Sequence, residues 1–345
     1  MAGKTLLLRR SRWMTWLVTG WCHFQSIGQP ASRPLLTRGS RRPERQGCLD
    51  MTVNVGFIGL GRMGTPMAAN VAAAGFPVCI YARRSEKAKE AAELMGVSVA
   101  LSPREVGSLA EVIILMVSDE PAVRAVLDGS DGLLAGLREG AIVVDMGTTG
   151  ISGTRWLAEA VKSKGAHLID APVSGSTASA TAATLTIMAG GAPETMERVR
   201  PILEAMCGSL YYMGESGTGA AMKLAVNAVI FALGQAVSEA LVLAEKTGVS
   251  RETAYDVFEN SAVAAPMVKY RRAAFLTPET TPTAFDLNLA NKDLGLIQEL
   301  ASSVGANMPQ ADVNRQLIVE AIAAGYGDLD MAGMAVFLRS GGTSV

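Results

Sequence analysis

The sequence predicts an α/β protein, in which a doubly wound parallel sheet comes first and an all-helical domain follows. Short runs of apolar and β-branched residues alternate with helical patterns, the first run leads into a glycine-rich turn, and a long apolar helix comes later. This alternation is typical of a parallel sheet with helices on both faces. We therefore expect a sheet domain over residues 52–214 and a helical domain over residues 215–345.

The composition agrees with two packed domains and excludes several kinds of site. Of the 345 residues, 49% are hydrophobic and 18% are charged, which is enough apolar material for two cores. The four cysteines form no CxxC pair, and the two histidines form no HExxH motif. We therefore expect no metal ion and no disulfide scaffold, and histidine is an improbable proton carrier.

The first 51 residues differ from the rest of the chain. The first fifty contain nine Lys or Arg and only two acids. This basic segment is expected to be disordered and has the composition of a mitochondrial transit peptide, while Met51 also fits a start assigned too far upstream. A secretory signal is the least favoured alternative. We expect a cytoplasmic protein, or a mitochondrial one if the leader is a transit peptide.

The charge and hydropathy of the remaining chain argue against two classes of partner. With the first fifty residues set aside, 22 basic and 30 acidic residues are left, a formal net charge of −8. No basic stripe for nucleic acid is present, and no apolar run approaches the roughly 20 residues that span a bilayer. We therefore expect neither a nucleic-acid nor a membrane partner.

A glycine-rich turn follows the first apolar run, "VNVGFIGL". Gly59 permits a tight turn, Gly61 lets the backbone approach a pyrophosphate, and Gly64 lets the next helix pack close to the strand. The following Ala-rich stretch predicts a helix whose first amides face the phosphates. The unit predicts a dinucleotide-binding Rossmann domain whose turn contacts the cofactor through Gly59, Leu60, Gly61, Arg62, Met63 and Gly64.

The end of the second strand, "FPVCIYA", indicates which dinucleotide is bound. An acid there would accept the ribose 2′-hydroxyl of NAD, whereas an arginine accommodates the 2′-phosphate of NADP. The chain has no acid at this point but continues with Arg83, Arg84 and Ser85. We therefore expect NADP as cofactor, held by Arg83, with NAD as the alternative if these arginines are only a solvated loop.

Further apolar runs predict strands that end in candidate site loops. Strand carboxyl ends bind ligands in such sheets. Runs such as "EVIILMVSD", "GAIVVDMGTT" and "GAHLIDAPVSG" have this form, and they place three dipeptides at strand ends: Ser118-Asp119, Thr148-Thr149 and Ser174-Gly175.

The helix predicted from Gly219 to Lys246 is apolar on nearly all sides. Lys223 and Asn227 lie four residues apart and so share one face of it. A desolvated lysine has a lowered pKa, as a proton carrier requires. The structural alternatives are a lysine that reaches solvent and an asparagine that bonds to a loop.

Because so apolar a helix needs to be covered by protein, we also expect a homodimer or homotetramer.

Four segments occur in order over residues 52–340: "GFIGLGRMGTPMAAN", "DAPVSGS", "GTGAAMKLAVN" and "FDLNLANKDLGL". They resemble the successive motifs of the β-hydroxyacid dehydrogenase family. The resemblance implies an NAD(P)-dependent oxidoreductase that transfers a hydride between nicotinamide and a small β-hydroxyacid or semialdehyde acid. Glyoxylate, succinic semialdehyde and 3-hydroxyisobutyrate are the substrate types, and the chain is most similar to NADPH-dependent reductases of the first two.

The resemblance also implies a role for each residue that matches a family motif. Lys223 is the implied proton donor and acceptor. The remaining implied contacts are those of Ser174, Gly175 and Asn227 with a small carboxylate substrate, of Thr148 with the nicotinamide, and of Lys292 with cofactor and substrate.

Three positions depart from the family pattern, and three other functions remain as alternatives. Gly147, Ala82 and Ala183 replace a common Ser, Asn and Gly. The alternatives are a 6-phosphogluconate-type decarboxylase, an imine reductase and a non-catalytic oligomerisation module. The helical part looks short for the first, and the presence of Lys223 argues against the other two.

Overall fold

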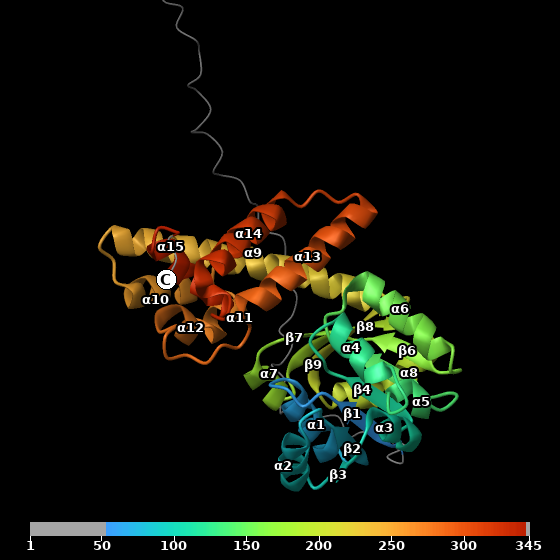
Figure 1. Ribbon diagram of the computed structural model, residues 1–345. Helices are drawn as coiled ribbons and strands as arrows, with labels where there is room; N and C mark the ends of the chain where they lie inside the picture. The colour runs from blue at the N-terminus through green and yellow to red at the C-terminus, as the bar shows by residue number, and fades with distance from the viewer. Residues whose placement is uncertain (1–52, 343–345) are drawn as a thin grey trace, which may run out of the picture. The chain divides into compact units, whose positions relative to one another are not determined.

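The computed structural model describes residues 53–342 (Figure 1). The expected basic leader, residues 1–51, lies outside the described residues. Strands alternate with helices in the first part of the described chain, and only helices and turns follow β9. The structure thus confirms the predicted fold class, a Rossmann-type α/β sheet followed by an all-helical part.

A nine-stranded sheet forms the first part, in the order β3-β2-β1-β4-β5-β6-β8-β7, with β9 also paired to β8. The pairs from β3 to β6 are parallel, and β8 runs antiparallel to β6 and β7. The strands are β1 (Val55–Ile58), β2 (Val78–Tyr81), β3 (Ser98–Val99), β4 (Val112–Leu115), β5 (Ile142–Asp145), β6 (His167–Asp170), β7 (Val173–Ser174), β8 (Leu185–Gly191) and β9 (Cys207–Gly214).

Helices cover both faces of the sheet, which explains why its strands are continuous apolar runs. All four residues of β1, β4 and β5 are buried, and successive residues contribute to two different cores. One core includes α1 (Gly64–Ala73), α2 (Ser85–Met95), α7 (Thr177–Thr181) and α8 (Pro193–Glu204). The other includes α3 (Pro103–Leu109), α4 (Glu120–Leu127), α5 (Leu133–Gly136) and α6 (Gly150–Lys162).

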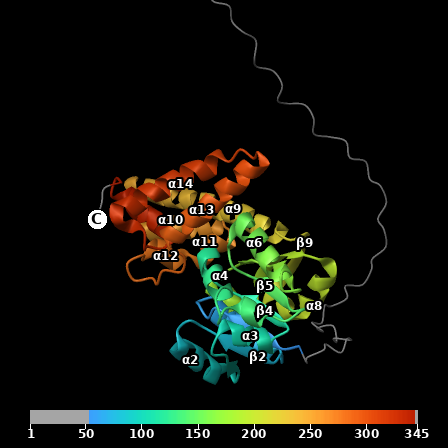
Figure 2. The ribbon, with the colours of Figure 1, turned by 45° about the vertical axis from the view of Figure 1, so that its right-hand side comes forward.

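The helical part is built around α9 (Thr218–Lys246), which begins against β8 and then packs on later helices (Figures 1 and 2). Two apolar clusters hold these helices together. The other elements are α10 (Arg251–Asn260), α11 (Pro266–Tyr270), α12 (Arg272–Leu276), α13 (Leu287–Val304), α14 (Pro309–Ala321), the turns η1 (Ile322–Tyr326) and η2 (Met331–Gly333), and α15 (Met334–Arg339).

Helix α9 corrects one expectation drawn from the sequence. It has 29 residues and a stretch of mean hydropathy 1.7, so by length and composition alone it could cross a membrane. The expectation that no apolar run approaches the roughly 20 residues that span a bilayer is therefore wrong. The helix nevertheless packs against α13, α14 and α15, and the polar Gln235 and Ser238 are among its buried residues. Core packing therefore explains part of its apolar character.

Other side chains of α9 remain exposed. Val229 and Leu243 are both 67% exposed. Uncovered aliphatic side chains of this size are compatible with a contact between copies of the chain. The homodimer or homotetramer stays a prediction.

Candidate active site

A cavity of about 460 Å³ lies at the carboxyl ends of β1, β4 and β5, and helical residues line it as well. The strand order reverses between β1 and β4, and ligands bind α/β sheets at such a point. The cavity therefore lies where the fold predicts a dinucleotide and its substrate. Eight of the predicted site residues line it: Gly61, Arg62, Met63, Gly64, Thr148, Gly175, Lys223 and Lys292.

The glycine-rich turn has the geometry that a pyrophosphate requires. Gly59 has φ +104°, and a Cβ on it would lie 2.2 Å from the Met116 carbonyl oxygen. A Cβ on Gly64 would lie 1.9 Å from the Gly59 carbonyl oxygen, whereas one on Gly61 would meet nothing within 4 Å. Two glycines thus permit the close packing, and the third leaves open space on the cavity side. No side chain caps the first amides of α1, so the residues present fit a dinucleotide phosphate.

Lys223 projects into the cavity from the second turn of α9. Desolvation by the surrounding protein lowers its pKa to about 8, and the positive charge of Lys292 acts in the same direction. Asp293 opposes this shift. At neutral pH the side chain is mostly an ammonium that can give up its proton without much cost, as a general acid must.

Lys292 joins the helical part to the two central strand loops. Its Nζ donates to the carbonyl oxygens of Ser118 at 3.0 Å and Thr148 at 2.9 Å. The same Nζ lies 2.9 Å from Oδ1 of Asp293. The other oxygen of that carboxylate accepts from Asn227 Nδ2 at 2.8 Å. A buried aspartate thus fixes both Lys292 and Asn227 beside Lys223.

Two further buried aspartates organise the loops on the sheet side. Asp145 ends β5, and it accepts from the Gly147 amide at 3.0 Å and the Thr149 hydroxyl at 2.9 Å. These bonds shape the loop that carries Thr148. Burial raises the pKa of Asp145, and Lys292 lowers it in part.

Asp170 ends β6 and anchors the start of α9. It accepts from the amides of Gly217 at 2.7 Å and Ala220 at 2.9 Å. The helix has no other side-chain cap, so this carboxylate replaces one. Burial raises its pKa to about 6 despite these bonds, and Asp145 adds to the increase.

Five predicted site residues do not line the cavity. Gly59 and Leu60 form the turn behind it, and Arg83 is exposed after the end of β2. Ser174 pairs with Thr186 in the short strand β7. Asn227 is only 4% exposed and is bonded to Asp293. Their roles toward cofactor and substrate stay predictions.

Sequence reasoning named neither the buried aspartates nor the second wall of the cavity. Asp145 and Asp170 each end an apolar run, in "IVVD" and "HLID", which is a signal that could have identified them. Asp293 follows Lys292 inside a motif that was recognised. The second wall includes Tyr270, Arg271, Phe285 and Asp330. Only Phe285 lies in a quoted motif, as the first residue of "FDLNLANKDLGL".

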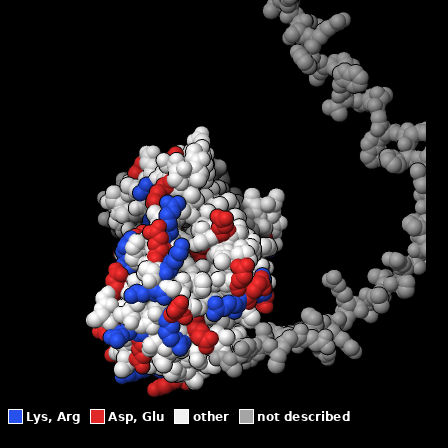
Figure 3. All heavy atoms as spheres, turned by 90° about the vertical axis from the view of Figure 1, so that its right-hand side faces the viewer, with Lys and Arg blue, Asp and Glu red and all other residues white. Residues whose placement is uncertain are grey.

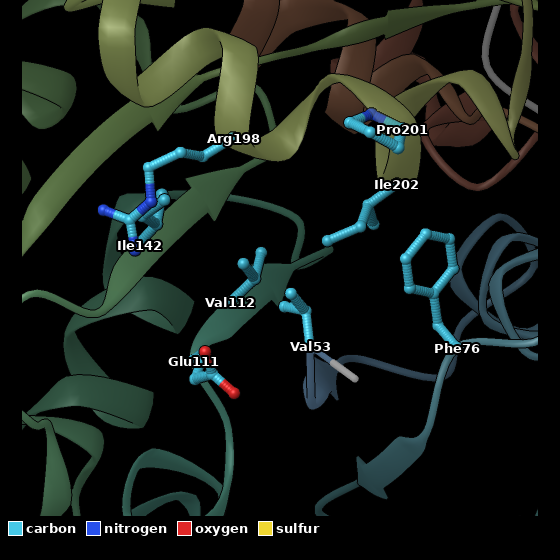
Figure 4. A pocket seen from close by; sticks show the side chains of 8 residues that line it. All are labelled: Val53, Phe76, Glu111, Val112, Ile142, Arg198, Pro201 and Ile202. Carbon is cyan, nitrogen blue, oxygen red and sulfur yellow. The ribbon is translucent and has the colours of Figure 1, made fainter. Parts of the chain in front are cut away.

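A second pocket, of about 350 Å³, lies at the amino ends of the central strands β1, β4 and β5 (Figure 4). It has no glycine-rich turn, and Glu111 and Arg198 form no ion pair with each other. Arg198 instead donates to the Gly140 carbonyl oxygen at 3.3 Å. On the face of the molecule in Figure 3, basic and acidic side chains are interspersed. Neither feature offers chemistry comparable to the cavity around Lys223.

Comparison with known proteins agrees with this geometry. A family model for the NAD-binding domain of 6-phosphogluconate dehydrogenase matches residues 54–214. A second model, for the NAD-binding domain of NADP-dependent 3-hydroxyisobutyrate dehydrogenase, matches residues 217–338. The two matches meet near the start of α9.

Individual relatives match over most of their length. Glyoxylate/succinic semialdehyde reductase 1 of Arabidopsis thaliana is 34% identical over 280 residues, 81% of this chain and 96% of the relative. 2-(Hydroxymethyl)glutarate dehydrogenase of Eubacterium barkeri is 30% identical over 285 residues, covering 82% and 94%. The solved 3-hydroxyisobutyrate dehydrogenase of Mycobacterium tuberculosis with L-serine is 33% identical, with a TM-score of 0.72 and coverage of 84% and 99%. The chain therefore belongs to the β-hydroxyacid dehydrogenase family of NAD(P)-dependent oxidoreductases.

Proposed function

We propose that the protein is an NADPH-preferring reductase of small aldehyde acids, with Lys223 as the proton donor. The observation that carries this proposal is the position of Lys223, whose desolvated ammonium lines the cavity at the carboxyl ends of the strands. Glyoxylate and succinic semialdehyde are the first candidate substrates, because a relative named for them covers most of the chain. The reverse reaction is oxidation of the corresponding hydroxyacid.

The chain's own residues supply orientation and a proton. When bound, the nicotinamide supplies the hydride that reaches the carbonyl carbon. Lys223 donates its proton to the carbonyl oxygen, and in the reverse direction its neutral amine accepts the proton of the hydroxyl. Lys292 is fixed by Asp293 and by two loop carbonyls. It therefore holds α13 against the loops that follow β4 and β5, where the cofactor is expected.

The substrate carboxylate is assigned to the loop after β7. Gly175 lines the cavity there, and Ser174 precedes it. Ser176 and Thr177 line the same part of the cavity, and Thr177 adds a hydroxyl donor, whereas the Ser176 hydroxyl caps α7 by accepting from the Ser179 amide. A carboxylate bound at this loop places the reacting carbon at a fixed distance from Lys223, and such orientation supplies much of a rate enhancement.

The proposal is tested by initial rates with both cofactors. The panel contains glyoxylate, succinic semialdehyde, methylmalonate semialdehyde, 3-hydroxyisobutyrate and a cyclic imine. Reduction of at least one aldehyde acid, with no reduction of the imine, supports the proposal. Turnover of the imine alone would replace it with an imine reductase.

Replacement of Arg83 by Ala should abolish most of the preference for NADPH over NADH. No carboxylate pairs with Arg83 or Arg84 among residues 53–342, and both precede the N-terminus of α2. One charge-assisted contact with the 2′-phosphate contributes about 1.5–3 kcal/mol. We expect wild-type kcat/KM to be at least about tenfold higher with NADPH, and the variant to approach equality.

The control for this measurement is Lys162→Ala, because Lys162 is an exposed cation on α6. It should leave the cofactor preference unchanged. Equal efficiency of the wild-type enzyme with both cofactors would contradict the assignment of Arg83.

The two reaction directions should depend on pH in opposite ways. Only the ammonium of Lys223 can donate, so the reductive kcat should fall as pH rises through about 8, the pKa set by burial of this side chain. Only the neutral amine can accept, so the oxidative kcat should rise over the same range. Stopped-flow or steady-state rates between pH 6 and about 10 measure both limbs. If kcat for reduction and kcat for oxidation changed with pH in the same direction, the role of Lys223 as proton donor and acceptor would be contradicted.

A further inference from the structure

The helical wall of the cavity contains a cation that the proposed reaction does not use. Arg271 lies between α11 and α12 and lines the same cavity as Lys223. Its side chain is only 12% exposed. A buried arginine needs partners for its charge and its N–H groups. The donors that the protein leaves unpaired therefore indicate what a ligand would contact.

Asp330 holds Arg271 without occupying its whole guanidinium. Nη1 of Arg271 donates to Oδ1 of Asp330. Burial raises the pKa of the neighbouring Tyr270, and Arg271 lowers it in part. Nε of Arg271 is buried without an acceptor in the described part of the chain. A guanidinium has five N–H donors in a planar fork that suits a carboxylate. The protein's own contacts therefore leave donor capacity in this fork.

The acids of the cavity are already engaged by the protein. Oδ2 of Asp330 accepts from the amides of Ala284 at 3.0 Å and Phe285 at 3.1 Å. Asp286 accepts from the Leu289 amide at 2.8 Å, and Asp293 is bonded as described above. Four basic side chains line the same cavity: Arg62, Lys223, Arg271 and Lys292. Three acids, Asp286, Asp293 and Asp330, also line it, so the lining has a formal net charge of +1 (four minus three), which favours an anionic group on a ligand.

Arg271 lies on the helical side of the cavity, whereas the glycine-rich turn and Thr148 lie on the sheet loops. The glycine-rich turn and Thr148 form the cofactor side of the cavity, on the loops after β1 and β5. Arg271 lies on the opposite wall, with Thr281, Pro282 and Phe285. A substituent that points away from the nicotinamide meets this wall, because the sheet loops occupy the other side.

We propose that Arg271 is a specificity-determining residue that binds a second carboxylate on the substrate. This carboxylate is additional to the one assigned to the loop of Ser174 and Gly175, so the inference rests on the function proposed above. The substrate class is then a β-hydroxyacid, or the matching semialdehyde acid, with an acidic side chain.

Two substrates of nearly equal shape test this in the wild-type enzyme. The first is 2-(hydroxymethyl)butanedioate, and the second is its 4-carboxamide, which lacks only the distal charge. We expect kcat/KM for oxidation to be at least about tenfold higher for the dicarboxylate. Equal values overturn the inference, even where 3-hydroxyisobutyrate is oxidised and the proposed function holds. Failure to turn over any hydroxyacid or aldehyde acid overturns the proposed function, and this inference with it.

Variants separate substrate binding from a purely structural ion pair. Arg271→Met should reduce the ratio of the two kcat/KM values to near one. Arg271→Lys keeps a positive charge beside Asp330 and so guards against misfolding. This variant should reduce the ratio only in part. Arg272→Gln is the control, because the adjacent Arg272 pairs with Asp256 and Glu259 and does not line the cavity. Its ratio should equal the wild-type ratio. An equal loss with both substrates in Arg271→Met would show a structural role and overturn the inference.

Discussion

Replacement of Lys223 by Ala should lower kcat by roughly 10²–10⁴-fold in both directions. The variant removes the proton donor but keeps the helix, since alanine is the best helix former. NADPH affinity, measured by calorimetry or fluorescence, should change little because the implied cofactor contacts lie on the sheet loops and at Lys292. The control is Met222→Ala, which changes the preceding residue of the same helix, where the side chain is 42% exposed. It should retain nearly normal turnover.

A second substitution at the same position separates proton transfer from charge. Arginine keeps a positive charge but stays protonated near neutral pH. Lys223→Arg should therefore fail to restore hydroxyacid oxidation. Near-normal turnover of Lys223→Ala would mean that Lys292 or water supplies the proton, and the role assigned to Lys223 would have to be abandoned.

The sheet could be predicted from the sequence because its signals are local. A strand buried on both faces is a continuous apolar run, as in β1 and β4. A tight turn against a neighbouring carbonyl needs glycine, as at Gly59 and Gly64. The apolar helix pattern then identified Lys223, and a family motif identified Lys292; both residues line the cavity. Each of these predictions depends on a few consecutive residues.

The remaining parts of the site depend on contacts between distant segments. Asp293 is 66 residues from Asn227, and Asp330 is 59 residues from Arg271. The sequence indicates neither pairing, because no spacing or periodicity relates the partners. Asn227 shows the consequence: its place on the face of Lys223 was predicted, but its bond to a buried carboxylate was not.

Asp170 provides the second large expected effect, because it connects the sheet to the helix that carries Lys223. Its carboxylate bonds the amides of Gly217 and Ala220, and Lys223 follows Ala220 by three residues on the same helix. Gly219 allows this approach, since a Cβ on it would lie 2.5 Å from the Asp170 carbonyl oxygen. Asp170 is thus a positioning residue, because it fixes the start of α9 and therefore the position of Lys223.

The pKa of Asp170 shows that its ionised carboxylate does not stabilise the folded protein. Burial raises the pKa from 3.8 to about 6, so the folded protein holds the proton more tightly than the unfolded chain does. The stabilising contribution of the protonated group is fully present below pH 3.8 and is lost as pH rises through about 6. At pH 7 the ionised carboxylate therefore costs about 3 kcal/mol of stability relative to its protonated form.

Asp170→Asn should therefore lose activity more than stability. Asparagine keeps one acceptor for the two amides, so the start of α9 shifts, and a misplacement of about 1 Å can reduce a rate about 10²-fold. We expect kcat to fall about 10- to 100-fold, with unchanged NADPH affinity. As pH falls from 7 to about 4, urea unfolding should show the wild type gaining up to about 3 kcal/mol relative to the variant.

Ser250→Ala is the matched control for Asp170→Asn, because Ser250 caps α10 by accepting from the Thr253 amide at 3.2 Å, and Ser250 does not line the cavity. It should lose about 1 kcal/mol of stability with no change in kcat. Cap loss alone would then be excluded as the cause of the activity lost in Asp170→Asn. A normal kcat in Asp170→Asn, or an activity loss that follows the fraction unfolded at each pH, would show that the anchor is structural and does not position Lys223.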